Sequence, residues 1–202
     1  LWSKAKKIIS GGNMLFSKRP DAYLPELWPA YFKKTNGCKV TDIDNNEYYD
    51  VSNMSVGTNT LGYSNKEVDK VVKKIINSGN MSTLNAPEEV YLAEKLLKMH
   101  KWADQVRFAR TGGEANSIAI RLARASTTKK NIAFCGYHGW HDWYLAANIK
   151  SNNLSKHLLN GLNVEGVPKI LKKTIFPFMY NDFKTLEKIV KKKNIGIIKM
   201  EV

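Results

Sequence analysis

Apolar residues at helical spacing predict three helices in the first half of the chain. Residues 1–10 have the pattern of an amphipathic helix, and Gly11 and Gly12 follow it where glycine commonly ends helices. Residues 66–77 repeat valine and isoleucine at intervals of three and four, which is typical of a helix lying against a core. A third helix is expected to begin near Pro87, because proline and acidic residues favour a first helical turn.

Two short runs of alternating polar and apolar residues predict a β-hairpin between the first two of these helices. The runs are Lys39–Ile43 and Glu47–Val51, and Asp44-Asn45-Asn46 between them has the composition of a tight turn. Residues 13–36 contain three prolines and are expected to be irregular. We therefore expect residues 1–60 to form an N-terminal segment with a helix, an irregular stretch and this hairpin.

From about residue 105 the predicted strands and helices alternate. The strands are expected at Gln105–Ala109, Asn131–Cys135, Lys172–Phe176 and Ile195–Val202, and the helices at Glu114–Ala125 and Phe183–Lys192. One face of the first of these helices is expected to be buried and carries Ala115, Ile118, Ala119 and Leu122. Alternation of apolar strands with helices indicates an α/β fold with a doubly wound, mostly parallel sheet. We assign this larger domain to residues 61–202.

The charge of the chain changes this picture little. Its 32 Lys and Arg residues outnumber its 18 Asp and Glu residues, which gives a formal net charge of +14. Such an excess first indicates a nucleic-acid or anionic surface. However, the lysines are scattered over expected helix faces, and no aromatic residues interleave with them as a single-strand-binding groove requires. A compositional bias explains the excess, and a basic nucleic-acid-binding domain is the alternative.

Cysteine usage and hydropathy indicate the compartment. Cys38 and Cys135 are too few for a disulfide framework, which favours a reducing compartment and therefore the cytoplasm. No apolar run approaches the ~18 residues that a membrane helix needs. The chain starts at Leu1 and stops at Val202 inside an apolar run, so we expect it to be part of a longer chain.

A glycine turn in the second half has the chemistry of an anion site. Thr111-Gly112-Gly113 follows the expected strand, and a helix begins at once. Free amides and the positive end of the helix dipole can bind a phosphate there, the glycines let the backbone approach it, and Thr111 adds a hydroxyl donor. The turn lacks the Gly-x-Gly-x-x-Gly and Gly-Lys-Ser/Thr patterns, so a dinucleotide or nucleoside triphosphate is disfavoured. A plain strand-to-helix turn is the structural alternative.

A second candidate segment follows the next strand. Tyr137 and His138 lie there between two glycines, and loops after neighbouring parallel strands converge on one crevice. An aromatic side chain beside a phosphate site suits a flat phosphorylated ring. His138, His141 and Asp142 could instead bind a metal ion, but no distant ligand with recognisable spacing completes that set.

Together these stretches resemble the class III aminotransferases, which are pyridoxal-phosphate-dependent enzymes of fold type I, and in particular their glutamate-1-semialdehyde aminomutase branch. The resemblance is carried by Gly112-Gly-Glu-Ala115, Ala119-Ile-Arg-Leu-Ala-Arg124 and Tyr137-His-Gly139. Upstream, Asn53–Gly62 is similar to the family segment that borders the substrate entrance. The resemblance implies the family's large α/β domain, pyridoxal 5'-phosphate as cofactor and a homodimer. It also implies amino-group transfer between a small-molecule amino donor and a carbonyl acceptor, with no nucleic-acid or membrane partner.

The resemblance assigns roles to both glycine-bearing segments. Gly112 and Gly113 would bind the cofactor phosphate through their backbone amides, with Thr111 beside them. Tyr137 would stack on the pyridine ring, and His138 would support that wall.

The resemblance extends to four further positions and shows two departures. Glu201 is similar to the glutamate of the family's Glu-Pro segment near the cofactor, although Val202 replaces the proline. Ser55, Val56 and Gly57 would border the substrate. Val56 stands where the aminomutases typically carry a tryptophan, so a broader aminotransferase is at least as well supported as an aminomutase.

No catalytic residue is expected within this chain. In the family, the aspartate that pairs with the pyridine nitrogen and the Schiff-base lysine both follow the segment that Glu201 resembles, which places them beyond Val202. Burial would lower the pKa of Lys199 and make it nucleophilic. Lys199 nevertheless lies in a predicted strand before that segment, so it is not expected to be this lysine. The chain alone is therefore expected to be inactive, and a fragment that merely folds is a further alternative.

Overall fold

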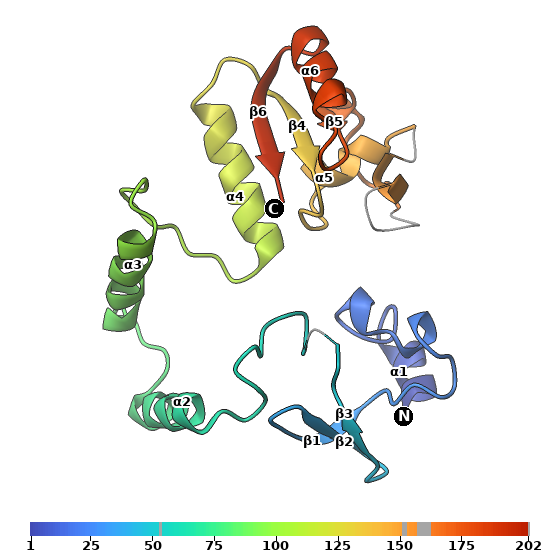
Figure 1. The fold of residues 1–202 in the computed structure, drawn as a ribbon, viewed down its shortest axis with the longest axis vertical. Helices are drawn as coiled ribbons and strands as arrows, with labels where there is room; N and C mark the ends of the chain where they lie inside the picture. The colour runs from blue at the N-terminus through green and yellow to red at the C-terminus, as the bar shows by residue number, and fades with distance from the viewer. Residues whose placement is uncertain (53, 151–152, 157–162, 202) are drawn as a thin grey trace. The chain divides into compact units, whose positions relative to one another are not determined.

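Figure 1 shows the chain as a computed structural model, which describes residues 1–52, 54–150, 153–156 and 163–201. The chain divides into two compact units, Leu1–Glu89 and Val90–Val202, and helix α3 (Pro87–Met99) crosses their boundary. The domain boundary expected near residue 60 stays a prediction. Among the helices of the described residues, none has the length and apolar character needed to cross a membrane.

The first unit contains helix α1, a three-stranded antiparallel sheet in the order β1-β2-β3, and helix α2. Their bounds are Trp2–Ile8 for α1, Phe32–Asn36 for β1, Lys39–Asp42 for β2, Glu47–Tyr49 for β3 and Lys66–Ser78 for α2. The expected helices and hairpin are confirmed. The expectation that residues 13–36 are irregular is wrong for β1, because this polar strand forms by backbone pairing with β2 rather than by apolar alternation.

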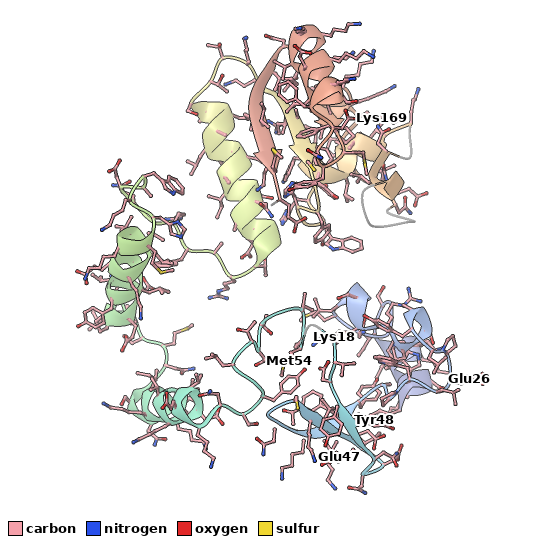
Figure 2. The ribbon with its side chains drawn as sticks, viewed as in Figure 1. Lys18, Glu26, Glu47, Tyr48, Met54 and Lys169 are labelled. Carbon is pink, nitrogen blue, oxygen red and sulfur yellow. The ribbon has the colours of Figure 1, made fainter. Side chains whose placement is uncertain are left out.

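Polar contacts hold the hairpin together. Asp42 is buried, and its carboxylate accepts hydrogen bonds from two backbone amides of the turn, from the Asn46 side chain and from the hydroxyl of Tyr48. Lys39 pairs with Glu47 across the two strands at 2.6 Å. Figure 2 labels Glu47 and Tyr48 on this hairpin. The turn is therefore built around one carboxylate whose hydrogen-bonding capacity is met locally.

Helix α2 has the predicted amphipathic pattern. The Asn65 side chain caps it by accepting from the amides of Glu67 and Val68. Its apolar stripe is nevertheless about half exposed, with Val68 at 48% and Ile76 at 59%. The core expected against this stripe is therefore not found among the described residues.

The second unit is built on a parallel sheet in the order β5-β4-β6, with helices on both faces (Figure 1). The strands are β4 (Asn131–Cys135), β5 (Ile175–Pro177) and β6 (Ile195–Met200), and the helices are α4 (Gly112–Ala125), α5 (Asp142–Leu145) and α6 (Phe183–Lys192). Short 3-10 turns also occur at Phe16–Lys18, Pro20–Ala22, Ala146–Asn148, Asn153–Lys156 and Lys169–Leu171. The central strand β4 is almost wholly buried. One core contains residues of α4 and α5, and the other contains residues packed beneath α6.

Two expectations about strands in this unit need correction. Residues 105–109 do not form a strand, because no strand of the described chain pairs with them and an unpaired segment has no ladder. The strand expected at Lys172–Phe176 begins later, at Ile175, because a 3-10 turn ends at Leu171 and the hydroxyl of Thr174 bonds back to its carbonyl.

The buried face of α4 also differs from the expected one. Ile120 is buried and packs in the core with Ala123, whereas Leu122 is 61% exposed and both Ala115 and Ala119 are exposed. Apolar residues occur almost all the way around this helix, so their spacing does not select one side. Packing against the sheet selects the side of Ile120, which lies about 200° from Leu122.

Candidate functional site

The first turn of α4 is fixed by a capping box. The hydroxyl oxygen of Thr111 accepts from the amide of Glu114 at 3.1 Å, and the Glu114 carboxylate accepts from the amide of Thr111 at 3.2 Å. Because these two amides are used, the helix start presents the amides of Gly112 and Gly113, which have no acceptor within the helix. The Thr111 hydroxyl keeps its proton for a further partner. This turn therefore fits an anion.

The loop after β4 touches this turn through its backbone. Gly139 has a φ of +95°, and a Cβ there would lie 2.8 Å from the Cα of Gly113. A Cβ at Gly113 would lie 3.0 Å from Nε2 of His141. A side chain at Gly139 would separate the two backbones, whereas one at Gly113 would press on the end of the His141 side chain, so Gly139 above all permits this close approach. The structure thus brings together the two stretches that the sequence singled out.

His138 is a buried, hydrogen-bonded ring at the base of this loop. Its Nε2 lies 2.8 Å from the carbonyl of Cys135, and its ring stacks on Trp143 with the ring centres 6.1 Å apart. Burial lowers the pKa of His138, and the positive charge of Lys199 acts in the same direction. The imidazole is therefore favoured in its neutral form, which suits a supporting position.

Tyr137 is the more accessible member of the aromatic pair. Its ring meets the edge of Tyr144 with 5.9 Å between the ring centres, and partial burial raises the pKa of its hydroxyl. The Tyr144 hydroxyl donates to the carbonyl of Gly136 at 3.3 Å, and burial raises the pKa of Tyr144 to about 12. Sequence reasoning did not single out Tyr144. Its spacing from the glycine loop carries no motif, and only the packed structure shows the contact.

Glu201 lies beside the same loop. Its Oε2 accepts a hydrogen bond from the amide of Tyr137 at 2.9 Å. Strands β4 and β6 are parallel neighbours, so their carboxyl ends share one edge of the sheet. Val202, which stands where the family has a proline, lies outside the described residues.

Lys199 lies in strand β6 opposite Phe134 and is partly buried. Burial lowers the pKa of its ammonium group, and the charge of Glu201 opposes that shift.

A shallow pocket flanks the first turns of α4. Its volume is about 510 Å³, and its lining includes Phe108, Arg110, Ser117 and His141. Sequence reasoning considered His141 only as a metal ligand with His138 and Asp142. Among the described residues, no three histidine, cysteine or acidic side chains are placed to share a metal ion.

Ser55, Val56 and Gly57 belong to the first unit, and Met54 with these three has positive φ values of 43° to 74°. They form a left-handed turn in which the Lys18 ammonium donates to the hydroxyl of Ser55 at 3.0 Å. Figure 2 labels Lys18 and Met54. The positive φ of Val56 is unusual for a β-branched residue. The substrate-binding role of this turn stays a prediction.

Comparison with known proteins identifies the family. Residues 25–196 match the description "Aminotransferase class-III", and the chain belongs to this family. Members of the family depend on pyridoxal phosphate. The family resemblance predicted from the sequence is therefore confirmed.

The curated relatives include both aminotransferases and aminomutases. The 3-aminobutyryl-CoA aminotransferase of Cloacimonas acidaminovorans is 33% identical over 191 residues, which cover 94% of this chain and 42% of that protein. The glutamate-1-semialdehyde 2,1-aminomutase of Nitrosopumilus maritimus is 36% identical over 196 residues, 95% of this chain and 43% of that protein. The chain thus spans less than half the length of these relatives.

A solved structure supports the fold. The Sphingopyxis sp. MTA144 FumI protein, in its PLP internal aldimine form, matches with a TM-score of 0.80 and 26% identity over 98% of this chain and 44% of that chain. The predicted class, an α/β fold of the fold-type I transferases, is confirmed.

Proposed function

We propose that the whole protein transfers an amino group between a small-molecule amino donor and a carbonyl acceptor, with pyridoxal 5'-phosphate as cofactor. The observation that carries this proposal is the direct backbone contact between the capped turn of Gly113 and the loop of Gly139. It brings an anion-binding helix start and an aromatic side chain to one edge of a parallel sheet. Membership of the class III aminotransferases supports the same cofactor.

Each residue of this site would have a defined task. The amides of Gly112 and Gly113 and the hydroxyl of Thr111 would hold the cofactor phosphate, where the helix dipole favours its negative charge. Tyr137 would cover one face of the pyridine ring, and the neutral, buried His138 would hold the loop beneath it. When bound, the cofactor supplies an electron sink for the charge that develops at the substrate carbon.

The phosphate site can be tested without disturbing the helix. A Gly113→Asp substitution places a carboxylate where the phosphate would bind, yet an acidic residue in a first turn favours the helix itself. We expect the full-length variant to lose pyridoxal phosphate on dialysis while its far-UV circular dichroism stays unchanged. Gly113→Asn is the matched control, because it places the same Cβ beside His141 without the negative charge, and it should retain more cofactor than Gly113→Asp. Retention of the cofactor by Gly113→Asp at the wild-type level would sink the assignment.

The reacting lysine can be located by chemistry. Borohydride reduction of the loaded full-length protein attaches the cofactor covalently to the lysine that holds it, and peptide mapping identifies that residue. We propose that this lysine is not Lys199, which lies within strand β6. A cofactor-labelled peptide containing Lys199 would contradict this.

The second candidate function is the aminomutase reaction, in which the amine returns to an adjacent carbon of the same skeleton. The 36% identity to a glutamate-1-semialdehyde 2,1-aminomutase favours it, whereas Val56 differs from the tryptophan expected there. Parallel assays with glutamate 1-semialdehyde alone and with separate amino donors and acceptors distinguish the two. Turnover only in the first assay would establish the aminomutase.

We also propose a homodimer in the cytoplasm. The family's enzymes typically act as dimers. The free cysteines Cys38 and Cys135 fit a reducing compartment. Light scattering of the full-length protein tests the dimer, and a monomeric mass would overturn it.

A further inference from the structure

Two hydrogen bonds link Glu201 to the start of the aromatic loop, the loop after β4 that carries Tyr137 and His138. The amide of Glu201 donates to the carbonyl of Cys135 at 3.1 Å and so continues the β4–β6 ladder by one residue. Its side chain then turns to the same loop, and Oε2 accepts from the amide of Tyr137 at 2.9 Å. One residue thus holds both sides of Gly136. The two segments are 64 residues apart in sequence, so this is a tertiary contact.

Gly136 is shaped to this contact. Its φ of +92° belongs to the left-handed region, and a Cβ there would lie 2.5 Å from the Cβ of Glu201 and 2.7 Å from its Oε2. Any side chain at this position would displace the carboxylate. The carbonyl of Gly136 is meanwhile held by the hydroxyl of Tyr144. The backbone from Cys135 to Tyr137 is therefore held by three hydrogen bonds, two to Glu201 and one to Tyr144.

We propose that Glu201 is a positioning residue, whose carboxylate clamps the backbone of Tyr137 so that the Tyr137 ring and the Gly139–Gly113 contact keep their places. This inference rests on the proposed function and deepens it, because the resemblance placed Glu201 near the cofactor without a physical task. The clamp acts through the Tyr137 loop, because Oε2 of Glu201 accepts from the amide of Tyr137. Its essential property is a hydrogen-bond acceptor, and its negative charge is secondary.

A pair of substitutions in the full-length holoenzyme separates the clamp from direct charge contact. Glu201→Gln keeps an acceptor oxygen but removes the charge, whereas Glu201→Ala removes both. We expect Glu201→Ala to weaken pyridoxal phosphate binding about tenfold and to diminish the visible circular dichroism of the bound cofactor, in line with loss of a hydrogen-bond acceptor. Glu201→Gln should bind within about threefold of wild type and keep the dichroic band. Equal damage by both substitutions would show that the charge acts directly and would overturn the proposal.

Gly136→Ala provides an independent test through a double-mutant cycle. Alone it should weaken cofactor binding, because its methyl group displaces the carboxylate. Its additional effect should be smaller in the Glu201→Ala background, where the contact with Oε2 is gone while the contact with the Cβ of residue 201 and the backbone strain remain. Additive effects would contradict the clamp. Glu187→Ala on α6 is the control for loss of a surface carboxylate, since Glu187 pairs with Lys191 one turn along the same helix.

One readout does not depend on the cofactor. Hydrogen exchange of the unloaded full-length protein should show faster exchange at residues 136–141 in Glu201→Ala than in Glu201→Gln, with α6 unchanged in both. If the wild type binds no pyridoxal phosphate, the proposed function fails while this comparison still tests the clamp. Equal exchange in the two variants would overturn the clamp whether or not the cofactor binds.

Discussion

The two three-stranded sheets of this chain are stabilised in different ways. In the second unit the parallel strand β4 is almost wholly buried, and its residue Phe134 is 0% exposed and meets the edges of Trp143 and Tyr144. In the first unit the antiparallel strands β1 and β3 are mostly exposed, and the buried side chain of that sheet is the carboxylate of Asp42. Apolar burial therefore dominates one sheet and local polar contacts the other.

This difference bears on function. The parallel sheet carries the aromatic loop at the carboxyl end of β4, and this loop contacts the glycine turn at Gly113, where small displacements would change the geometry of a bound ligand. A densely packed core resists such displacements. The hairpin sheet, by contrast, tolerates exposure because its turn satisfies its own polar groups.

The largest expected effect comes from the buried sheet. Phe134→Ala should destabilise the full-length protein by about 3–5 kcal/mol, because it removes a buried ring and leaves a cavity. Phe32→Ala makes the same change in β1, where Phe32 is 68% exposed, and should stay within about 0.5 kcal/mol of wild type. Urea unfolding measures both. Similar losses would break the contrast between the two sheets.

The next effect concerns the hairpin. Asp42→Ala leaves the amide of Asn46 and the hydroxyl of Tyr48 without their acceptor, so it should lower the urea midpoint, though less than Phe134→Ala does. Asp44→Ala in the same turn removes an exposed carboxylate and is the matched control. Equal midpoints for the two variants would show that the Asp42 contacts do not stabilise the turn.

A smaller effect is expected where the chain leaves the hairpin sheet. The Tyr63 hydroxyl donates to Asp50 at 2.6 Å, and burial together with that carboxylate raises the pKa of Tyr63 to about 12. Tyr63→Phe should destabilise the protein by about 1 kcal/mol through loss of this hydrogen bond. Because the pKa is higher in the folded state, the Tyr63 contribution holds below about pH 10 and is lost as the pH rises through about 12. If wild type and Tyr63→Phe have the same urea midpoint at neutral pH, the Tyr63 hydrogen bond does not stabilise the protein.

The smallest expected effects distinguish the two sheets by the pH range in which each loses stability. Burial lowers the pKa of His138, so its contribution is complete above the unfolded value of about 6.5 and is lost as the pH falls through the folded pKa. The hydrogen bond from the Asn46 side chain lowers the pKa of Asp42, so its contribution is lost only below about pH 3.9. Urea midpoints between pH 8 and pH 3 should therefore fall in two stages. His138→Gln should reduce the first stage and Asp42→Asn the second, and the opposite assignment would contradict this comparison.

Local sequence patterns predict much of this molecule. The bounds expected for β4 and α6 agree with the structure, because each has a strong period and clear ends. The turn proposed to bind phosphate is also foreseeable, since Thr111 and Glu114 form a capping box from residues three positions apart. The family motif adds Tyr137 and His138, which the structure places on the loop that touches Gly113.

Other features depend on partners that local patterns do not contain. Strand β1 has polar residues and exists because β2 pairs with it. The buried side of α4 is chosen by the sheet, and residues 105–109 do not form a strand because none of the described strands pairs with them. None of these outcomes is encoded within a window of a few residues.

The sequence by itself determined the alternation of strands and helices, the two glycine-bearing segments and the family to which the chain belongs. These follow from side-chain period, from the conformational freedom of glycine and from motifs of a few residues. Only the tertiary structure decided that Gly139 meets Gly113 and that Glu201 holds Tyr137. Those contacts depend on strand order and helix packing, which bring together backbone atoms far apart in the sequence.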